Sequence, residues 1–350
     1  MLRASRCTTA AARFARVAPL RRALCSAPSP PTYAEKIDDN MNLPPRFEEV
    51  LRGVGQVIFL NSPAAGTAVL AALTYGDPWL GTMAALGTIS ATASAHAWKA
   101  DSDAISAGLM GYNGCLVGCA FSVFLGNPTG SLTTALATVA GAAATAPLAS
   151  MLKPLCGSVP QFTLAFNFTT LTALFAVQPL KGAAAADPAT TISAMEWLCS
   201  PLVGVSQIFV VNDALSGAAI LGAIGMYSPM CAAHTLLGSC VGVATGLVCG
   251  APATEIGAGL WGFNPALTSL AVSVFFVPSM QSYALATGSA AATALLFGGA
   301  KAVMGGVFGV PALTLPFCAV AAANHLLVQN YSIAGLALAA APHSPERNAA

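Results

Sequence analysis

Two glutamines in short apolar runs are the first candidates for chemistry with a solute. Gln56 lies in the run 53–60 and Gln207 in the run 204–211, and no charged residue occurs in either. An amide left unpaired in an apolar medium costs roughly 2–7 kcal/mol. Each glutamine must therefore bond either to a neighbouring helix or to a polar solute that passes it. The presence of a glutamine in both runs favours the second reading.

An aromatic residue and an asparagine follow in two glycine-rich blocks, GLMGYNG and GLWGFNP. Four residues after each aromatic, Tyr112 or Phe263, comes a leucine, Leu116 or Leu267. Residues four apart share one face of a helix, and glycines let helices approach closely. Two such faces brought together would form an apolar slit with amides nearby. Simple helix packing is the alternative for the glycines.

A Pro-x-x-Thr pattern supplies the third pair, Pro160 with Thr163 and Pro311 with Thr314. Proline interrupts the backbone hydrogen-bond ladder and leaves carbonyl oxygens free. The threonine hydroxyl adds a donor and an acceptor. Two such elements would give a short column of oxygens without net charge. A proline-kinked helix whose threonine bonds its own backbone is the alternative.

All three patterns occur twice at one spacing, which indicates an internal duplication. Gly53 recurs 151 positions later as Gly204. The same shift relates Gln56 to Gln207, Asn61 to Asn212, Pro78 to Pro229, Asn113 to Asn264 and Thr163 to Thr314.

The composition places both copies in a membrane. Charged residues make up 8% of the chain and hydrophobic residues 56%, whereas soluble domains carry about 25% charged residues. Between positions 53 and 345 the basic residues are Lys99, Lys153, Lys181 and Lys301. A soluble fold of this length needs more charge on its surface. We therefore predict an all-α multispanning membrane protein.

Each copy has room for about five spans of about 20 residues plus one short helix. The expected spans are 64–76, 79–98, 104–125, 131–150 and 162–180, then 214–227, 229–250, 256–277, 282–300 and 313–341. A break within the last one is the alternative to a continuous span. Breaks are expected at 77–78, 99–103, 127–128, 153–154 and 182–190. An odd number of spans inserts the second copy upside down, as an inverted-topology repeat. The runs 53–60 and 204–211 would then be half-spanning pore helices.

The expected organisation has five parts. They are a disordered basic segment 1–32, an amphipathic lead-in helix 33–52, membrane repeats 53–196 and 197–341, and a polar tail 342–350. The first segment has six arginines and no acid before Glu35, a composition typical of a mitochondrial or plastid transit peptide. A basic cytoplasmic tail is the alternative. We expect a plasma-membrane protein, or a mitochondrial or plastid one if the segment directs import.

The duplicated Gln, Asn, GYNG-type and Pro-x-x-Thr patterns together resemble the urea transporter family of facilitative urea channels, over residues of about 44–340. The resemblance implies passive urea transport across a lipid bilayer by a homotrimer. Each protomer would hold its own pore of about ten spanning helices and two pore helices. It implies neither a cofactor nor a nucleic-acid partner.

The resemblance also implies roles for individual residues. Gln56 and Gln207 would bond urea at the two ends of the filter. Thr163 and Thr314, with nearby carbonyls, would form an oxygen ladder for the N–H groups of urea. The slot that keeps urea flat would be lined by Phe59, Tyr112, Leu116, Val210, Phe263 and Leu267.

The chain departs from the family pattern at two points. Ala165 stands where a second proline is expected, and both pore runs carry Gln where some members have one Glu. A filter without charge should pass neutral urea and reject ammonium and protons. An ion- or proton-coupled transporter, the main alternative, needs an ionisable residue on its path. Its candidates, Asp213, Glu196 and Glu255, have no charged counterpart in the first copy; an ammonia or water channel is the other alternative.

Enzyme chemistry finds little support. The chain has no H-E-x-x-H, G-x-S-x-G, C-x-x-C or Walker loop. Cys115 and Cys119 share a helical face, but thiols inside spans behave as small apolar side chains. The four histidines, at 96, 234, 325 and 343, are scattered. We predict neither an enzyme nor a metal site.

Overall fold

The computed structural model describes residues 32–126, 130–177 and 191–349. The expectations for the basic N-terminal segment and for breaks at 127–128 and 182–190 therefore lie outside the described residues, apart from residue 32. The described part is helical, with one isolated bridge between Phe276 and Leu338. Its first helices are α3 (Tyr33–Met41), α4 (Pro45–Gln56), α5 (Pro63–Gly76), α6 (Pro78–Ala97), α7 (Ser102–Ser106), α8 (Tyr112–Phe124), α10 (Ser131–Cys156) and α11 (Leu164–Val177).

The helices of the later part repeat this series at the spacing found in the sequence. They are α12 (Ala194–Ser206), the 3-10 helix η2 (Gln207–Phe209), α13 (Ala214–Tyr227), α14 (Pro229–Val248), α15 (Ala253–Gly257), α16 (Phe263–Phe275), α17 (Met280–Phe308), α18 (Leu315–Asn330) and α19 (Pro345–Asn348). Both bounds of α5, α6, α7 and α8 recur 151 positions later in α13, α14, α15 and α16.

Local capping residues explain why these helices begin where they do. Ser62 and Asp213 accept hydrogen bonds from the first turns of α5 and α13. Asp77 and Ser228 do the same for α6 and α14, whose first residue is proline. Such side chains satisfy backbone N–H groups that a helix start leaves without partners. The predicted spans 64–76, 79–98, 214–227 and 229–250 agree with these four helices to within two residues at either end.

Two predicted spans, 104–125 and 256–277, are broken. A turn with Gly108 at φ 75° separates α7 from α8, and one with Gly259 at φ 70° separates α15 from α16. A Cβ on Gly108 would lie 2.5 Å from the backbone N of Gly53, and one on Gly259 would lie 2.5 Å from that of Gly204. The apolar runs are continuous in sequence, but these backbone crossings require a turn and a glycine.

The predicted lead-in helix 33–52 and the short pore helix 53–60 are also divided differently. The break falls after α3, at Asn42 to Pro44, and α4 begins with Pro45, so α4 carries both lead-in residues and Gln56. Proline favours the first turn of a helix and disfavours helical geometry in the residue before it. The last span, 313–341, is broken, which was the alternative expected for it, because α18 ends at Asn330.

Several helices are long and apolar enough for a multispanning membrane protein. Among the described residues, α10, α14 and α17 each satisfy this by length and composition, and α12 with η2 and α13 satisfies it as a pair bent by 75°. α10 and α17 extend beyond the predicted 131–150 and 282–300. Large apolar side chains of these two helices, such as Leu136 and Leu295, are exposed, as lipid-facing residues are.

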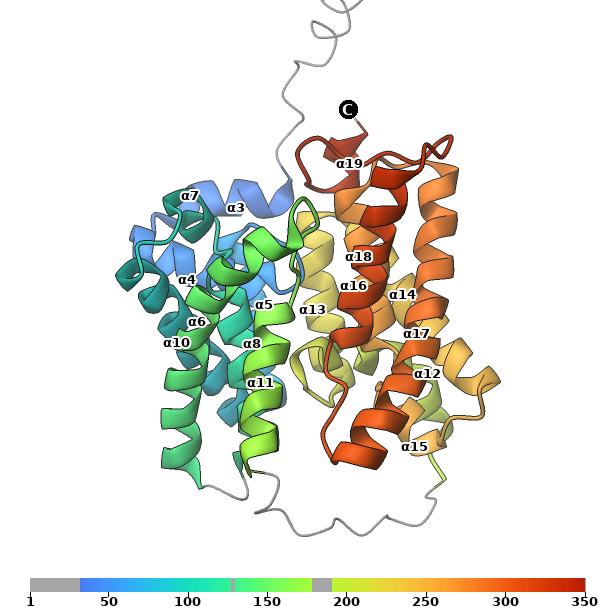
Figure 1. Cartoon of the computed structure of the whole chain (residues 1–350), viewed down its shortest axis with the longest axis horizontal. Coiled ribbons are helices and arrows are strands. Elements are labelled where there is room, and N and C mark those ends of the chain that lie inside the picture. The colour runs from blue at the N-terminus through green and yellow to red at the C-terminus, as the bar shows by residue number, and fades with distance from the viewer. Residues whose placement is uncertain (1–31, 127–129, 178–190, 350) are drawn as a thin grey trace, which may run out of the picture.

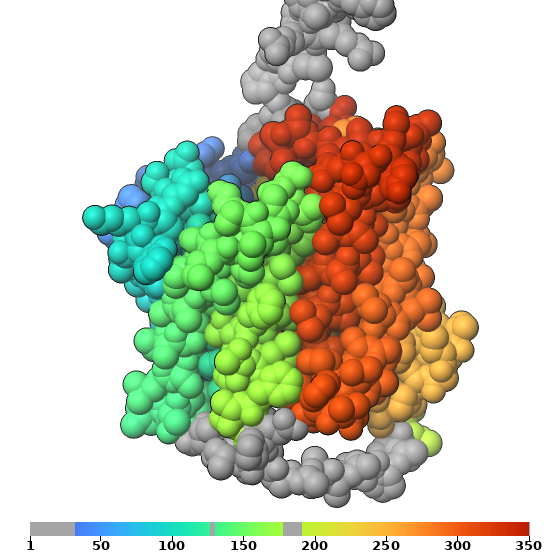
Figure 2. All heavy atoms as spheres, viewed as in Figure 1, coloured from blue at the N-terminus to red at the C-terminus, as the bar shows by residue number. Residues whose placement is uncertain are grey.

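The two halves of the chain meet along α11 and α18. Figure 1 shows α4 to α11 on the left and α13 to α18 on the right, with α11 and α18 leading away from mid-height toward opposite ends. Figure 2 shows the surfaces of these two segments in contact. Their first turns therefore lie near the middle of the molecule, where Phe166 and Phe317 belong to the largest cluster of buried apolar side chains.

Close helix contacts within each half depend on glycine. A Cβ on Gly66 of α5 would lie 1.8 Å from the carbonyl oxygen of Leu51 in α4. A Cβ on Gly217 of α13 would lie 1.9 Å from that of Leu202 in α12. Both distances are far below van der Waals contact, so any side chain here must separate the two helices.

Gly66→Ala and Gly217→Ala should each lower the free energy of unfolding by about 1–3 kcal/mol, the usual cost of overpacking. Thermal melting of the purified protein in detergent measures this loss. Gly222→Ala is the matched control on α13, because no atom lies within 4 Å of its added Cβ. It should be neutral or stabilising by about 0.5–1 kcal/mol. Equal melting of all three variants would contradict the packing argument.

The predicted polar tail is docked against the bundle. Arg347 of α19 donates to Glu35 of α3 at 2.5 Å, and the His343 ring stacks on Tyr227 with centroids 5.3 Å apart. Glu346 accepts from the Ser228 hydroxyl at 2.7 Å, at the start of α14. We call these six residues the terminal latch.

The terminal latch should weaken in acid. Burial, and next the Arg347 charge, lower the pKa of His343 below its usual 6.5. The unfolded chain therefore binds this proton first, so stability is full above pH 6.5 and declines as the pH falls below it. Thermal melting between about pH 7.5 and pH 5 should show this decline. His343→Asn should reduce it; an unchanged decline would contradict the assignment to His343.

Candidate functional site

The two threonines predicted to form an oxygen ladder touch each other. Their Oγ1 atoms lie 2.7 Å apart, and both residues are 3% exposed. Thr163 directly precedes α11 and Thr314 directly precedes α18, so each half of the chain contributes one hydroxyl to the centre. The Pro-x-x-Thr elements lie before the helix starts rather than at kinks within helices.

The backbone around this centre is strained in the same way in both halves. Phe162 and Leu313, each just before a threonine, have φ of 47° and 50°. Phe59 and Val210, in the turns that follow α4 and η2, have φ of 62° and 64°. Left-handed backbone at a residue other than glycine costs of order 1–3 kcal/mol and tends to occur at functional sites. These turns allow α4 and η2, and α11 and α18, to end or begin inside the molecule.

Asn113 and Asn264 hold the starts of α11 and α18. Asn113 accepts from the N–H of Phe166 at 3.1 Å, and Asn264 accepts from that of Phe317 at 3.2 Å. Both N–H groups are in first turns, where a helix supplies no carbonyl partner. Asn264 also donates to the carbonyl of Leu313 at 3.0 Å. The sequence placed these amides beside the slit but assigned them no role.

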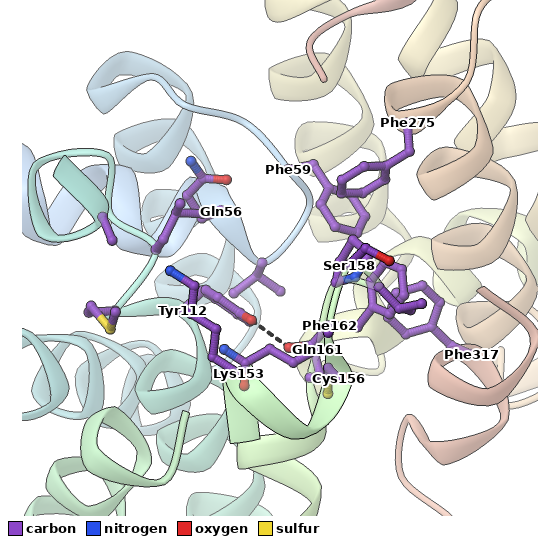
Figure 3. A pocket seen from close by; sticks show the side chains of 18 residues that line it. Gln56, Phe59, Tyr112, Lys153, Cys156, Ser158, Gln161, Phe162, Phe275 and Phe317 are labelled. Carbon is purple, nitrogen blue, oxygen red and sulfur yellow. Dashed lines mark hydrogen bonds between the residues drawn. The ribbon is translucent and has the colours of Figure 1, made fainter. Parts of the chain in front are cut away.

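A cavity of about 340 Å³ opens beside this centre, within the first half and at its border with the second. It brings together four of the ten predicted site residues, Gln56, Phe59, Tyr112 and Thr163. Figure 3 shows Gln56 and Tyr112 on one side, the Phe59, Phe162, Phe275 and Phe317 rings on the other, and the bond from the Tyr112 hydroxyl to the Phe162 carbonyl.

Three of those aromatic rings were missed by the sequence analysis. The ring centroids of Phe59 and Phe275 lie 5.5 Å apart, and those of Phe162 and Phe317 lie 5.2 Å apart. Both pairs are arranged edge to face. The position of Phe317 three residues after Thr314 was a usable signal, as was that of Phe162 directly before Thr163. Phe275 lies at the far end of α16, and no sequence pattern connects it to the cavity.

The other six predicted site residues do not line this cavity. Leu116 and Leu267 are buried in the apolar core, and Val210 and Phe263 pack against it. Thr314 lies behind Thr163 at the centre, and Gln207 is partly exposed on η2.

Gln56 bridges two elements and also faces the cavity. Its Nε2 donates to the carbonyl of Ala107 at 2.8 Å, in the turn between α7 and α8. Among the described residues, none bonds its Oε1. The Gln56 amide can therefore do both things expected of it. Its Nε2 links two elements of the fold, and its Oε1 can accept a hydrogen bond from a solute.

The acidic residues considered for ion coupling have structural partners and lie away from the cavity. Asp213 accepts from the N–H of Ser216 at 2.6 Å, and Glu196 caps the start of α12. Glu255 pairs with Lys301 and accepts from the Trp261 ring N–H at 3.1 Å. Lys153 is the charged residue among those that line the cavity. In the described part of the chain, no three His, Cys, Asp or Glu side chains cluster as metal ligands do.

Comparison with known proteins identifies the family of the chain. The family model described as "Urea transporter" matches residues 47–329. The chain belongs to the urea transporter family. It is similar to Urea transporter 1 of Ovis aries, with 35% identity over 286 residues, covering 77% of this chain and 73% of that protein. For Urea transporter 1 of Mus musculus the identity is 34% over 284 residues, with the same coverage.

Family membership establishes the general function. Members are channels and not enzymes, and this urea transporter is a multi-pass integral membrane protein that transports urea across membranes. The resemblance inferred from the duplicated motifs is thus confirmed.

Asn264→Leu should loosen the start of α18 in the urea transporter. The change removes the acceptor for Phe317 N–H and the donor to the Leu313 carbonyl, so we expect the free energy of unfolding to fall by roughly 1–3 kcal/mol. Thermal melting measures it. Asn330→Leu, at the exposed end of the same helix, should cost less than about 0.5 kcal/mol. Equal effects at the two positions would show that Asn264 is not holding the helix start.

Proposed function

We propose that urea flows passively through a narrow pore between two inverted repeats, each of about five spanning helices and one pore helix. The Thr163–Thr314 contact at 2.7 Å is the observation that carries this proposal, because it joins equivalent residues of the two halves. The opposite directions of α11 and α18 in Figure 1 support the inversion. The repeats would comprise residues 53–196 and 197–341, with α4 extending the first one toward its N-terminus.

The proposed filter replaces the water around urea from two directions. Apolar side chains would contact the two flat faces, with Phe59, Tyr112 and Leu116 from one repeat and Val210, Phe263 and Leu267 from the other. Gln56 and Gln207 would bond urea at the two ends, and the threonines with nearby carbonyls would accept from its N–H groups. Binding at each point must stay weak so that urea can leave.

The same centre opposes cations. The N-terminal ends of α11 and α18 carry the positive ends of the two helix dipoles, and both begin at the threonine contact. Lys153 adds a positive charge at the cavity. No carboxylate lines the cavity in the part of the chain that is described. Urea has no net charge and is unaffected, whereas ammonium and protons would be repelled.

The proposed assembly is a homotrimer in which each protomer has its own pore. Large apolar side chains along α10 and α17 remain exposed in the single chain, including Leu132, Leu136, Leu295 and Val307. Such faces suit contact with lipid or with another protomer. The plasma membrane is the proposed location, with a mitochondrial or plastid membrane as the alternative.

Urea flux into proteoliposomes tests the pore. The double variant Gln56→Ala with Gln207→Ala should lower urea permeability roughly tenfold, because each lost hydrogen bond is worth about 0.5–1.5 kcal/mol. Gln281→Ala is the control, since this exposed glutamine is not among the residues that line the cavity. Wild-type permeability no higher than that of protein-free lipid would refute the proposal.

The same vesicles distinguish passive flow from coupled transport. Collapsing the membrane potential or the proton gradient should leave urea flux unchanged, because the acids that coupling would use have structural partners. A flux that follows either gradient would support the coupled alternative. Comparing the permeabilities for urea, ammonia and water tests the remaining alternative, an ammonia or water channel.

A further inference from the structure

Asn167 contacts both threonines at the centre of the molecule. It lies on α11 one turn after Thr163, and only 1% of it is exposed. We propose that Asn167 is a positioning residue that fixes the direction of the hydrogen bonds between the threonines, so that the Thr163 hydroxyl is free to donate to the carbonyl oxygen of urea. This inference rests on the proposed pore.

The Asn167 amide can have only one orientation. Its Oδ1 accepts from the backbone N–H of Thr314 at 3.2 Å, and its Nδ2 donates to the backbone carbonyl of Thr163 at 2.9 Å. A backbone N–H can only donate and a carbonyl can only accept, so exchanging the two amide atoms would lose both bonds. The second Nδ2 proton then points to the Thr314 Oγ1, 2.9 Å away.

This donor sets the direction of the next bonds. Among the described residues, the Thr314 hydroxyl contacts only the Asn167 Nδ2, which cannot accept, and the Thr163 Oγ1 at 2.7 Å. Its proton must therefore go to Thr163. The Thr163 hydroxyl in turn lies 3.1 Å from the Cys318 sulfur, a weak acceptor. The bonds run from Asn167 to Thr314, to Thr163 and finally to Cys318.

The direction exists because the two repeats differ at this position. Asn167 and Cys318 are related by the 151-residue shift, and each lies beside the threonine of the opposite repeat. With an amide at both positions, each hydroxyl would receive a donor and neither direction would be favoured. One amide and one thiol make the pair directional.

This direction of the hydrogen bonds suits urea, a planar diamide whose carbonyl oxygen can accept a hydrogen bond from Thr163. Thr163 lines the cavity, whereas Thr314 does not. The Thr163 proton can leave the sulfur for a carbonyl oxygen at little cost, because the thiol bond is weak. The remaining lone pairs of the hydroxyls accept N–H groups. Thiourea has the same shape as urea, but its sulfur is a poor acceptor, so it gains less from this donor.

Asn167→Leu tests the proposal by removing the donor at similar volume. In proteoliposomes we expect urea permeability to fall roughly three- to tenfold, the equivalent of one lost hydrogen bond, while thiourea permeability falls less. Asn167→Asp should be impaired at neutral pH and should recover as acid protonates the carboxyl and restores a donor. Asn167→Leu should not recover. Thr170→Val, at equal burial on α11, is the control.

Cys318 provides a second test with little risk to folding. Cys318→Ser gives Thr163 a stronger acceptor and should lower urea permeability, whereas Cys318→Ala removes the acceptor and should leave it equal or higher. Folded Asn167→Leu protein with wild-type permeability and a wild-type urea-to-thiourea ratio would overturn the proposal. If Asn167→Leu does not fold, equal permeability of the two Cys318 variants would overturn it. Wild-type protein without urea flux would instead refute the pore itself.

Discussion

The structure depends on one constraint, which is that backbone polar groups away from water must have partners. Two helices, α11 and α18, begin in the middle of the molecule rather than at its surface. One N–H group in each first turn, that of Phe166 or Phe317, would otherwise be unpaired there, and it donates to Asn113 or Asn264. The threonines, the strained turns and the cavity are arranged around helix starts that these two amides stabilise.

Much of the fold could be predicted because its signals are local. The capping residues Ser62, Asp77, Asp213 and Ser228 determine where four helices begin, and a proline follows three of them. The duplication repeats this pattern in the second half. The breaks at Gly108 and Gly259 were missed because the surrounding runs are uniformly apolar. The turns are explained only by close approaches of backbone segments that are distant in sequence. Gly108 approaches Gly53, and Gly259 approaches Gly204.

The site was predicted less completely than the fold because it is formed across the two halves. The duplication identified Thr163 and Thr314, and the contact between them joins one copy to the other. It did not show which residues of the second copy would join Gln56, Phe59, Tyr112 and Thr163 in the cavity, where Phe275 and Phe317 lie. A four-residue spacing likewise placed Leu116 on a helical face but did not show that Leu116 packs in the buried apolar cluster beside the cavity rather than lining it.

The terminal latch has a consequence for the order of assembly. Ser228 caps one N–H of the first turn of α14, but the N–H of Met230 in the same turn donates to Glu346 at 3.1 Å, and Glu346 is synthesised 116 residues later. During translation this N–H must therefore remain hydrated, or find another partner, while α15 to α18 are made. Once Arg347 reaches Glu35, the chain is closed into a ring by contacts between its first and last described helices. Closing such a long loop costs entropy that rises only slowly with length, so a few well-placed bonds suffice to hold the ring.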